Sequence, residues 1–398
     1  MEHYHEPDLA QRRLFRRGGS ETVHRDRFLG TSFGLISYSE MPAKPPRTYF
    51  AAQLADEQPL SQRTASRLCK LAAEICAAEP WLCMDEEQTV AVLRKRGEQP
   101  DFISVLGALG QHRAIHVYPG LAGYAWFRDV VESGDEWRLR LLLTECEALQ
   151  AAYPEPDEIT DLDMELLRGC RFPAADKAFH FRSVRRGYLP WYISEEEGRR
   201  LAVCLEAFVQ MLKSGILMEP EKWWPEEAAA MPVFARQQGQ WVFSKISIRL
   251  EKVRESRLWI SQERFERLPF HTRRGVLCLG DHLMHGAAGL ENERPIVLQL
   301  LAVVDAPSGF AFEPRLREPG EILASAAADV LVKAIQARDA IPERVLVSEP
   351  YYAEELQALA RAAGFEIQLR QRLPVLEELF RGLENFQRRR AGRGPRLA

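Results

Sequence analysis

The sequence has no apolar run that approaches the roughly 20 residues needed to cross a bilayer, although 46% of its 398 residues are hydrophobic. Its first residues are charged and contain no apolar stretch of the kind found in a secretory signal. We therefore expect a cytoplasmic protein with no membrane partner.

Cysteine is sparse and has no metal-binding pattern. The seven cysteines are scattered, and no two form a C-x-x-C pair. This argues against a zinc ribbon and indicates reduced thiols. Cys69 and Cys76 lie seven residues apart on one predicted helix. We interpret them as small core residues rather than as ligands or a redox pair.

Motifs of common enzyme classes are also missing. There is no G-x-S-x-G nucleophile turn, and Gly107 and Gly110 lack the context of a phosphate-binding loop. No complete catalytic constellation is visible, so the sequence predicts no cofactor and leaves enzymatic activity open.

Charge is nearly balanced, with a formal net charge of -4. This gives no overall attraction to nucleic acid. Arginines cluster near the two ends of the chain. We interpret these clusters as solvated tails, and the alternative is an arm that contacts phosphates.

A chain of this length is expected to form two or three domains. Composition and periodicity predict an α+β N-terminal part followed by a layered α/β domain with a mixed sheet. The expected divisions are a poorly ordered lead-in (1–45), an N-terminal α+β module (46–150), a middle module packed on it (151–235), the C-terminal α/β domain (236–387) and a basic tail (388–398).

Two local patterns are specific enough to locate elements. Ser194 and Glu197 form a capping box, and the following residues place apolar side chains on one helical stripe. Near the C-terminus, strands and helices alternate from Ile296 to Asn385. We expect the strands at 297–304 and 344–348 to be neighbours, joined by a right-handed crossover through the intervening helix.

Several long segments together resemble a bacterial protein family built from two adjacent domains of unknown function. The first group comprises CAAEPW (76–81), FISVLGALGQHRAIHVYPGLAG (102–123) and GYLPWYISEEE (187–197). The second comprises LAVVDAPSG and IPERVLVSEPYYAEELQALARAAGFEIQLRQRLPVLEEL. The resemblance covers most of residues 60–390. It implies a cytoplasmic bacterial protein whose relatives occur with modules like those of mobile-element passenger proteins, and it assigns no site residue.

The order of the C-terminal elements also resembles the ribonuclease H and integrase fold. That resemblance implies a two-metal site for Mg²⁺ or Mn²⁺, with Asp305 after the first strand and a second acid after a later one. The later strand ends at Ser348 and Glu349 rather than at an Asp, so Glu349, or Glu377 and Glu378 on the last helix, would have to substitute. The favoured interpretation is that the segment from Asp305 to Gly309 is a hairpin turn, in which Asp, Pro and Gly serve the backbone.

Two further groups of residues could bind a ligand. His282 and His285 are three apart and could face a metal from one helical turn, but the flanking glycines favour a polar loop. A second segment mixes basic and aromatic residues, namely Arg182, Arg185, Tyr188, Trp191 and Tyr192. We favour structural packing for it, and the alternative is a surface that stacks bases or binds a peptide.

The sequence therefore predicts a non-catalytic binding or interaction module with a protein or nucleic-acid partner. The alternative is a divergent ribonuclease H-like nuclease that depends on metal and is linked to mobile elements. Carboxylates converging on Asp305 would favour the nuclease.

Overall fold

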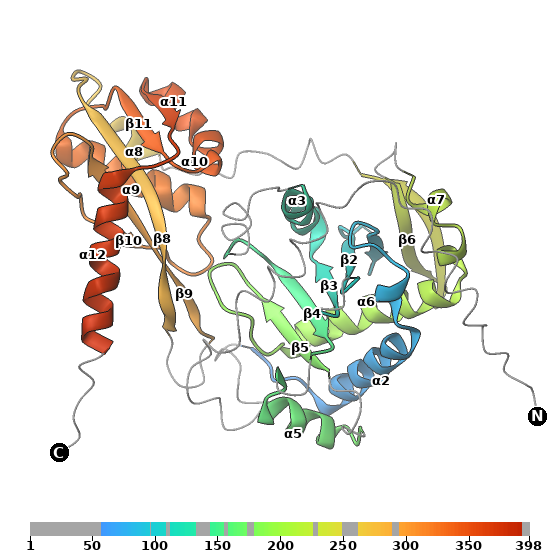
Figure 1. Ribbon diagram of the computed structural model, residues 1–398. Helices are drawn as coiled ribbons and strands as arrows, with labels where there is room; N and C mark the ends of the chain where they lie inside the picture. The colour runs from blue at the N-terminus through green and yellow to red at the C-terminus, as the bar shows by residue number, and fades with distance from the viewer. Residues whose placement is uncertain are drawn as a thin grey trace, which may run out of the picture.

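The computed structural model describes residues 57–95, 97–108, 112–132, 144–154, 158–172, 179–225, 230–248, 262–288 and 294–391. The predicted lead-in lies outside these residues, and so does most of the predicted basic tail. None of the helices in the described ranges is long and apolar enough to cross a membrane. The elements form two mixed sheets with helices on both faces of each, which confirms the predicted fold class (Figure 1).

The first sheet has seven strands in the order β5-β4-β3-β2-β1-β6-β7. Neighbouring strands are antiparallel except β1 and β6, which are parallel. The bounds are β1 Val90–Leu93, β2 Asp101–Leu106, β3 Ala114–Tyr118, β4 Ala148–Ala152, β5 His180–Val184, β6 Ala230–Gln237 and β7 Gln240–Ser247.

Helices cover both faces of this sheet. The larger core lies under α2 (Gln62–Ala78), α5 (Asp161–Gly169) and α6 (Glu195–Lys213), and the opposite face packs against α3 (Gly120–Val131). Short helices occupy the connections: η4 Pro80–Leu82, η6 Ile216–Met218, α7 Pro220–Trp223 and α8 Gln262–Glu266.

The expected boundaries at 150/151 and 235/236 both fall inside strands of this sheet, in β4 and β6. The physical reason is the pairing of β1 with β6, which brings residues 91–93 beside residues 233–235. Residues assigned in the sequence to an N-terminal module, a middle module and the start of the C-terminal domain therefore share one sheet.

The second sheet has the order β10-β9-β8-β11-β12. Strands β8, β9 and β10 are antiparallel neighbours, and β11 and β12 run parallel to β8. The strands are β8 Val276–Ala288, β9 Ile296–Asp305, β10 Arg315–Leu316, β11 Arg344–Val347 and β12 Glu366–Leu369. The helices are α9 Leu323–Arg338, α10 Pro350–Glu355, α11 Gln357–Ala363 and α12 Pro374–Ala391. Helices α9, α10 and α11 pack on one face and α12 on the other (Figure 1).

The prediction that strands 297–304 and 344–348 are neighbours is wrong, because β8 lies between them. The segment from Gly280 to Gly286, interpreted as a polar loop, belongs to β8. The polar residues and flanking glycines of this segment did not indicate a strand in the sequence. Gly280 allows the Leu376 side chain of α12 to pack closely, since a Cβ there would lie 3.1 Å from Leu376 Cδ1.

The helix predicted after Ser194 is α6, and its capping box is confirmed. Ser194 Oγ accepts a hydrogen bond from the Glu197 backbone N–H at 3.3 Å, and Glu197 Oε2 accepts one from the Ser194 N–H at 2.8 Å. A second capping box, between Thr160 and Asp163, begins α5.

We predict that Ser194→Ala lowers the free energy of unfolding by about 1 kcal/mol, because the N-terminus of α6 loses an acceptor. Urea titration measures the change. Ser194→Thr keeps the hydroxyl and should stay close to the parent. Equal losses in the two variants would contradict a capping role.

Candidate functional site at the junction of the two sheets

The main chains of the two sheets meet where the segment after β5 contacts the start of β9. Tyr188 and Ile296 form an antiparallel bridge. The Leu189 N–H donates to Pro295 O at 2.9 Å, and the Val297 N–H donates to Gly187 O at 2.9 Å. The two sheets are therefore joined by backbone hydrogen bonds as well as by side chains.

Gly187 stands at the centre of this contact, with a positive φ of 75°. A Cβ on this residue would lie 3.1 Å from Pro319 Cα, so a larger residue would push the two backbones apart. Its N–H donates to Thr144 O at 2.9 Å. Glycine is required here both by conformation and by close approach.

A buried arginine crosses the junction from the segment after β10. Arg317 is 5% exposed. Its guanidinium donates to Gln299 Oε1 at 2.9 Å and to Thr144 Oγ1 at 3.2 Å, and it forms an ion pair with Glu145. Its Nε also donates to the backbone O of Glu321 at 2.8 Å. This one side chain thus links Gln299 on β9 of the second sheet to the segment that leads into β4 of the first sheet.

The network continues from Gln299 to Asp281 on β8. Gln299 Nε2 donates to Asp281 Oδ2 at 2.7 Å, and the Tyr352 hydroxyl donates to Asp281 Oδ1 at 2.6 Å. Burial raises the pKa of Asp281, while the hydrogen bonds from Tyr352 and Gln299 and the charge of Arg317 oppose that rise. Both carboxyl oxygens are therefore occupied by donors of the chain itself.

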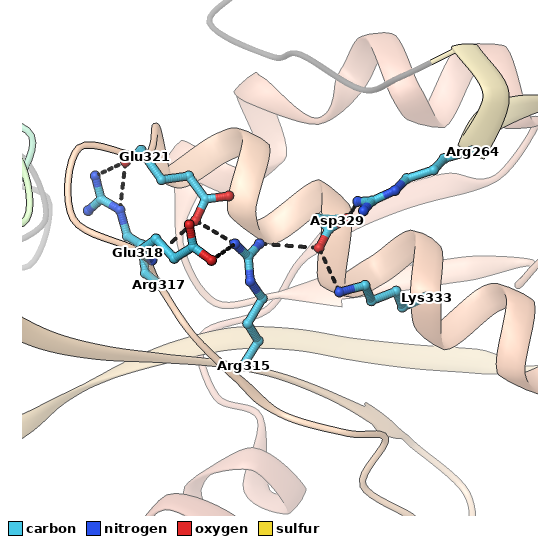
Figure 2. A network of polar contacts seen from close by, with 7 residues as sticks. All are labelled: Arg264, Arg315, Arg317, Glu318, Glu321, Asp329 and Lys333. Atoms are coloured by element: carbon cyan, nitrogen blue, oxygen red, sulfur yellow. Dashed lines mark hydrogen bonds and ion pairs between the residues drawn. The ribbon is translucent and has the colours of Figure 1, made fainter.

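A more exposed ion-pair network borders Arg317 (Figure 2). Arg315 donates to Glu321 Oε2 at 2.8 Å and to Asp329 Oδ2 at 3.2 Å. Lys333 also pairs with Asp329, at 3.0 Å. These contacts tie β10 to α9 and fix the segment from which Arg317 projects.

The two acids predicted for a metal site are not brought together. Asp305 lies opposite Leu277 in the β8–β9 ladder, at the end of the sheet where β11 begins. Glu349 follows the other end of β11 and precedes α10 as its N-cap residue. The parallel direction of β8 and β11 therefore places the two carboxylates at opposite ends of these strands.

Asp305 has the turn contacts that the favoured interpretation predicts, together with an ion pair that it does not. Its Oδ2 accepts from the Ser308 N–H at 3.2 Å and from the Ser308 hydroxyl at 2.6 Å. The Gly309 N–H instead donates to the backbone O of Asp305 at 2.9 Å. Burial would raise the pKa of Asp305, but the two hydrogen bonds from Ser308 and the ion pair with Arg338 lower it.

Asp281 adjoins the predicted histidine pair in the sequence but was not among the acids proposed for the two-metal site. It lies two residues beyond Leu279, and Glu349 lies two residues beyond Val347, the residue that pairs with Leu279. Asp281 and Glu349 thus follow the same end of the β8–β11 ladder. The only signal in the sequence is an Asp embedded in the apolar segment VLCLGDHL.

The predicted histidine pair lies on β8. His282 Nε2 is 3.2 Å from Glu384 Oε1, and its ring stacks on Phe380 with centroids 5.1 Å apart. The side chain of His285 lies outside the described part of the structure. Within the described part, no three His, Cys, Asp or Glu side chains gather as a metal site would require.

Three of the predicted binding residues are buried. Arg182 and Tyr192 are 0% exposed and Trp191 is 2% exposed. Arg182 donates to Asp163 at 2.8 and 2.6 Å, and its guanidinium lies over the Tyr192 ring. These side chains cannot stack on an external base, which corrects the hypothesis of a binding surface for them.

The other two binding candidates lie at the junction. Arg185 is partly exposed and pairs with Glu197 at 2.6 Å and with Glu57. Tyr188 packs beneath Arg294, whose guanidinium carbon is 5.9 Å from the ring centroid. Both residues therefore face partners within the chain.

A row of buried polar side chains also crosses the first sheet. Ser104, His116, Gln150 and Arg182 are cross-strand partners on β2, β3, β4 and β5. Burial, followed by the charge of a neighbouring histidine, lowers the pKa of His116 to about 3, so its imidazole is neutral. The row specifies strand register, because a shift by one residue would turn these polar groups to the apolar opposite face.

Comparison with protein families gives two matches. Residues 66–230 match a domain of unknown function (DUF7309), and residues 267–384 match a second domain of unknown function (DUF6930). The chain carries two adjacent domains of unknown function. This confirms the resemblance found in the sequence. No curated protein and no solved structure matches the chain.

The junction joins these two domains. Glu145 and Gly187 belong to the first matched range, and Ile296 and Arg317 belong to the second. The first range ends at the first residue of β6, so β6 and β7 complete the sheet from outside it.

We predict that Arg317→Met lowers the free energy of unfolding by up to about 3–5 kcal/mol. Buried Glu145 loses this ion pair and keeps the one with Arg186 at 3.3 Å, and Gln299 loses a donor. Adding Glu145→Gln should restore part of the loss. Urea unfolding measures both.

Arg267→Met serves as the matched control for that prediction. Arg267 pairs with Glu263 on the surface, where its side chain is 70% exposed. Its substitution should cost less than about 1 kcal/mol. A similar cost for the two arginines would show that the Arg317 network is not essential.

Proposed function

We propose that the protein is a non-catalytic binding or interaction module. The observation that carries this proposal is that the buried acids of the junction have partners within the chain. Asp281 accepts hydrogen bonds from Tyr352 and Gln299, and Glu145 forms an ion pair with Arg317. The cation beside these acids is a guanidinium of the chain. Such a network stabilises one arrangement of two domains and leaves its carboxylates committed to internal partners.

A surface on the first sheet supports this proposal. We call this surface the β7 patch. It is formed by Trp241, Phe243 and Lys245 of β7 together with Trp223 of α7 and Arg236 of β6. The Phe243 ring lies 5.5 Å from Trp223, and Arg236 lies over Trp241 at 5.1 Å. Phe243 is 44% exposed. Aromatic residues and arginine are enriched in protein interfaces, so this composition suits a binding face.

The patch favours a protein partner over nucleic acid. Arg236 already forms an ion pair with Glu206, and Lys245 Nζ donates to the backbone O of Lys222. Lys222 in turn pairs with Glu219 at 2.7 Å. These cations are paired or hydrogen-bonded within the chain, so the exposed Phe243 ring and the partly buried Trp223 and Trp241 beside it are the apolar surface left for a partner to cover.

We predict that a protein retained by the immobilised parent from a lysate of its native host is lost on Phe243→Ser, because the exposed ring of the patch is removed. Quantitative mass spectrometry measures retention. Phe310→Ser is the matched control, since Phe310 is an exposed phenylalanine (62%) in the turn after β9. Equal loss in both variants, or in neither, would contradict the patch as the interface.

The alternative function is a divergent ribonuclease H-like nuclease that depends on Mg²⁺ or Mn²⁺. The topology of the second sheet favours it, because three antiparallel strands are followed by two strands parallel to the first. Asp281 on the central strand and Glu349 after β11 follow the same end of the ladder. As these residues lie, however, Asp281 accepts hydrogen bonds from Gln299 and Tyr352 and is close enough to Arg317 to be affected by its positive charge, which disfavours a divalent cation there.

Thermal melts with and without Mn²⁺ separate the two functions. We predict no metal-induced rise in the melting temperature of the parent, because occupied carboxylates would have to give up their partners. Asp281→Asn and Asp305→Asn test the two candidate positions separately. Asp305→Asn also removes the charge that faces Arg338, so a modest loss of stability without metal is expected.

Cleavage assays on an RNA–DNA hybrid and on single-stranded DNA complete the test. A rise in melting temperature with Mn²⁺ in the parent that is absent from Asp281→Asn, together with cleavage lost in the same variant, would replace the binding function by the nuclease.

A further inference from the structure

Two cysteines that are far apart in the sequence meet between α2 and α5. Cys69 lies on the buried face of α2, and Cys170 directly follows the last residue of α5. Cys170 packs against the buried cluster that contains Cys69, and the two thiols are close enough to interact. Gln62 Nε2 also donates to Gly169 O at 2.7 Å, which ties the same two helices together.

The two thiols have different surroundings. Cys69 is 2% exposed and belongs to the main core, whereas Cys170 is only partly buried at its edge. A hydrogen bond from Cys69 lowers the pKa of Cys170 to about 7; burial opposes this, and a hydrogen bond from Ser66 contributes to it. The same bond and burial raise the pKa of Cys69. The lowered pKa thus belongs to the more accessible of the two sulfurs.

We propose that Cys69 and Cys170 are a redox modification site, at which a peroxide converts the two thiols into a reversible disulfide that links α2 to α5. The proposal rests on the contact between the thiols and on their unequal access to solvent. It is independent of the binding function proposed above.

The reaction follows from the positions of the two sulfurs. The Cys170 thiolate attacks one oxygen of hydrogen peroxide, the O–O bond breaks, and hydroxide leaves, giving a sulfenic acid on Cys170. Cys69 then attacks that sulfur, forms the S–S bond and displaces water. Two thiols and one peroxide give one disulfide and two waters, so the thiols are oxidised and the peroxide is reduced.

The remaining cysteines provide the comparison. Cys146, Cys204 and Cys278 are buried, and burial raises the pKa of each above its ordinary value. Cys83 is exposed. Cys76 lies on α2 two turns after Cys69 and is partly buried, which makes it the matched control.

The test treats the full-length protein with hydrogen peroxide, blocks the remaining thiols by alkylation, and maps peptides without reduction. We expect a linked peptide pair containing Cys69 and Cys170, which dithiothreitol separates. The melting temperature of the oxidised protein should rise by roughly 4–10 °C, because the bond closes a long loop in the unfolded chain.

Variants distinguish the roles of the two sulfurs. Cys69→Ser should stop at a sulfenic acid on Cys170 that dimedone traps, Cys170→Ser should form no link, and Cys76→Ser should behave as the parent. If a variant fails to fold, the peptide map of the parent decides. A parent in which Cys69 and Cys170 remain alkylatable after peroxide, or in which another pair is linked, would overturn the proposal.

Discussion

The arrangement of the two domains depends on one buried guanidinium. Arg317 is removed from water, and an unpaired charge in that position would destabilise the fold by several kcal/mol. Its acceptors therefore have to be in place together, and they come from β9 (Gln299) and from the segment before β4 (Thr144 and Glu145). Because β9 also pairs with the chain near Gly187, charge pairing and backbone pairing specify the same relative position of the two sheets.

Features determined by neighbouring residues could be predicted from the sequence. The capping box of Ser194 and Glu197 involves residues three apart, and the apolar stripe of α6 repeats within each turn. Sheet membership could not be predicted, because β1 meets β6 across more than a hundred residues. The part of β8 from Gly280 to Gly286 was interpreted as a loop for a related reason. Asp281 is acceptable inside a sheet only because Gln299 and Tyr352, both distant in sequence, supply its donors.

The same reasoning explains the outcome for the candidate site. Asp305 has the Ser308 contacts expected from the D-A-P-S-G pattern, whereas its pairing with Arg338 depends on how α9 packs. For the basic and aromatic residues around Arg182, the sequence favoured packing and left a binding surface as the alternative. In the structure Asp163 pairs with the Arg182 guanidinium, which lies over the Tyr192 ring. The contact between Cys69 and Cys170 required knowledge of how α5 packs on α2, which no periodicity in either helix contains.

The pairing of β1 with β6 bears on how the chain folds as it is synthesised. Strands β1 to β5 can associate as a local meander, but one edge of β1 has no partner until residues 230–237 leave the ribosome. Val90, Ala91 and Val92 are fully buried in the finished sheet. During that interval they form an apolar edge open to other nascent chains. We expect a chaperone that binds extended apolar segments to bind the nascent chain at this edge. A product truncated before β6 would leave the edge of β1 unpaired permanently.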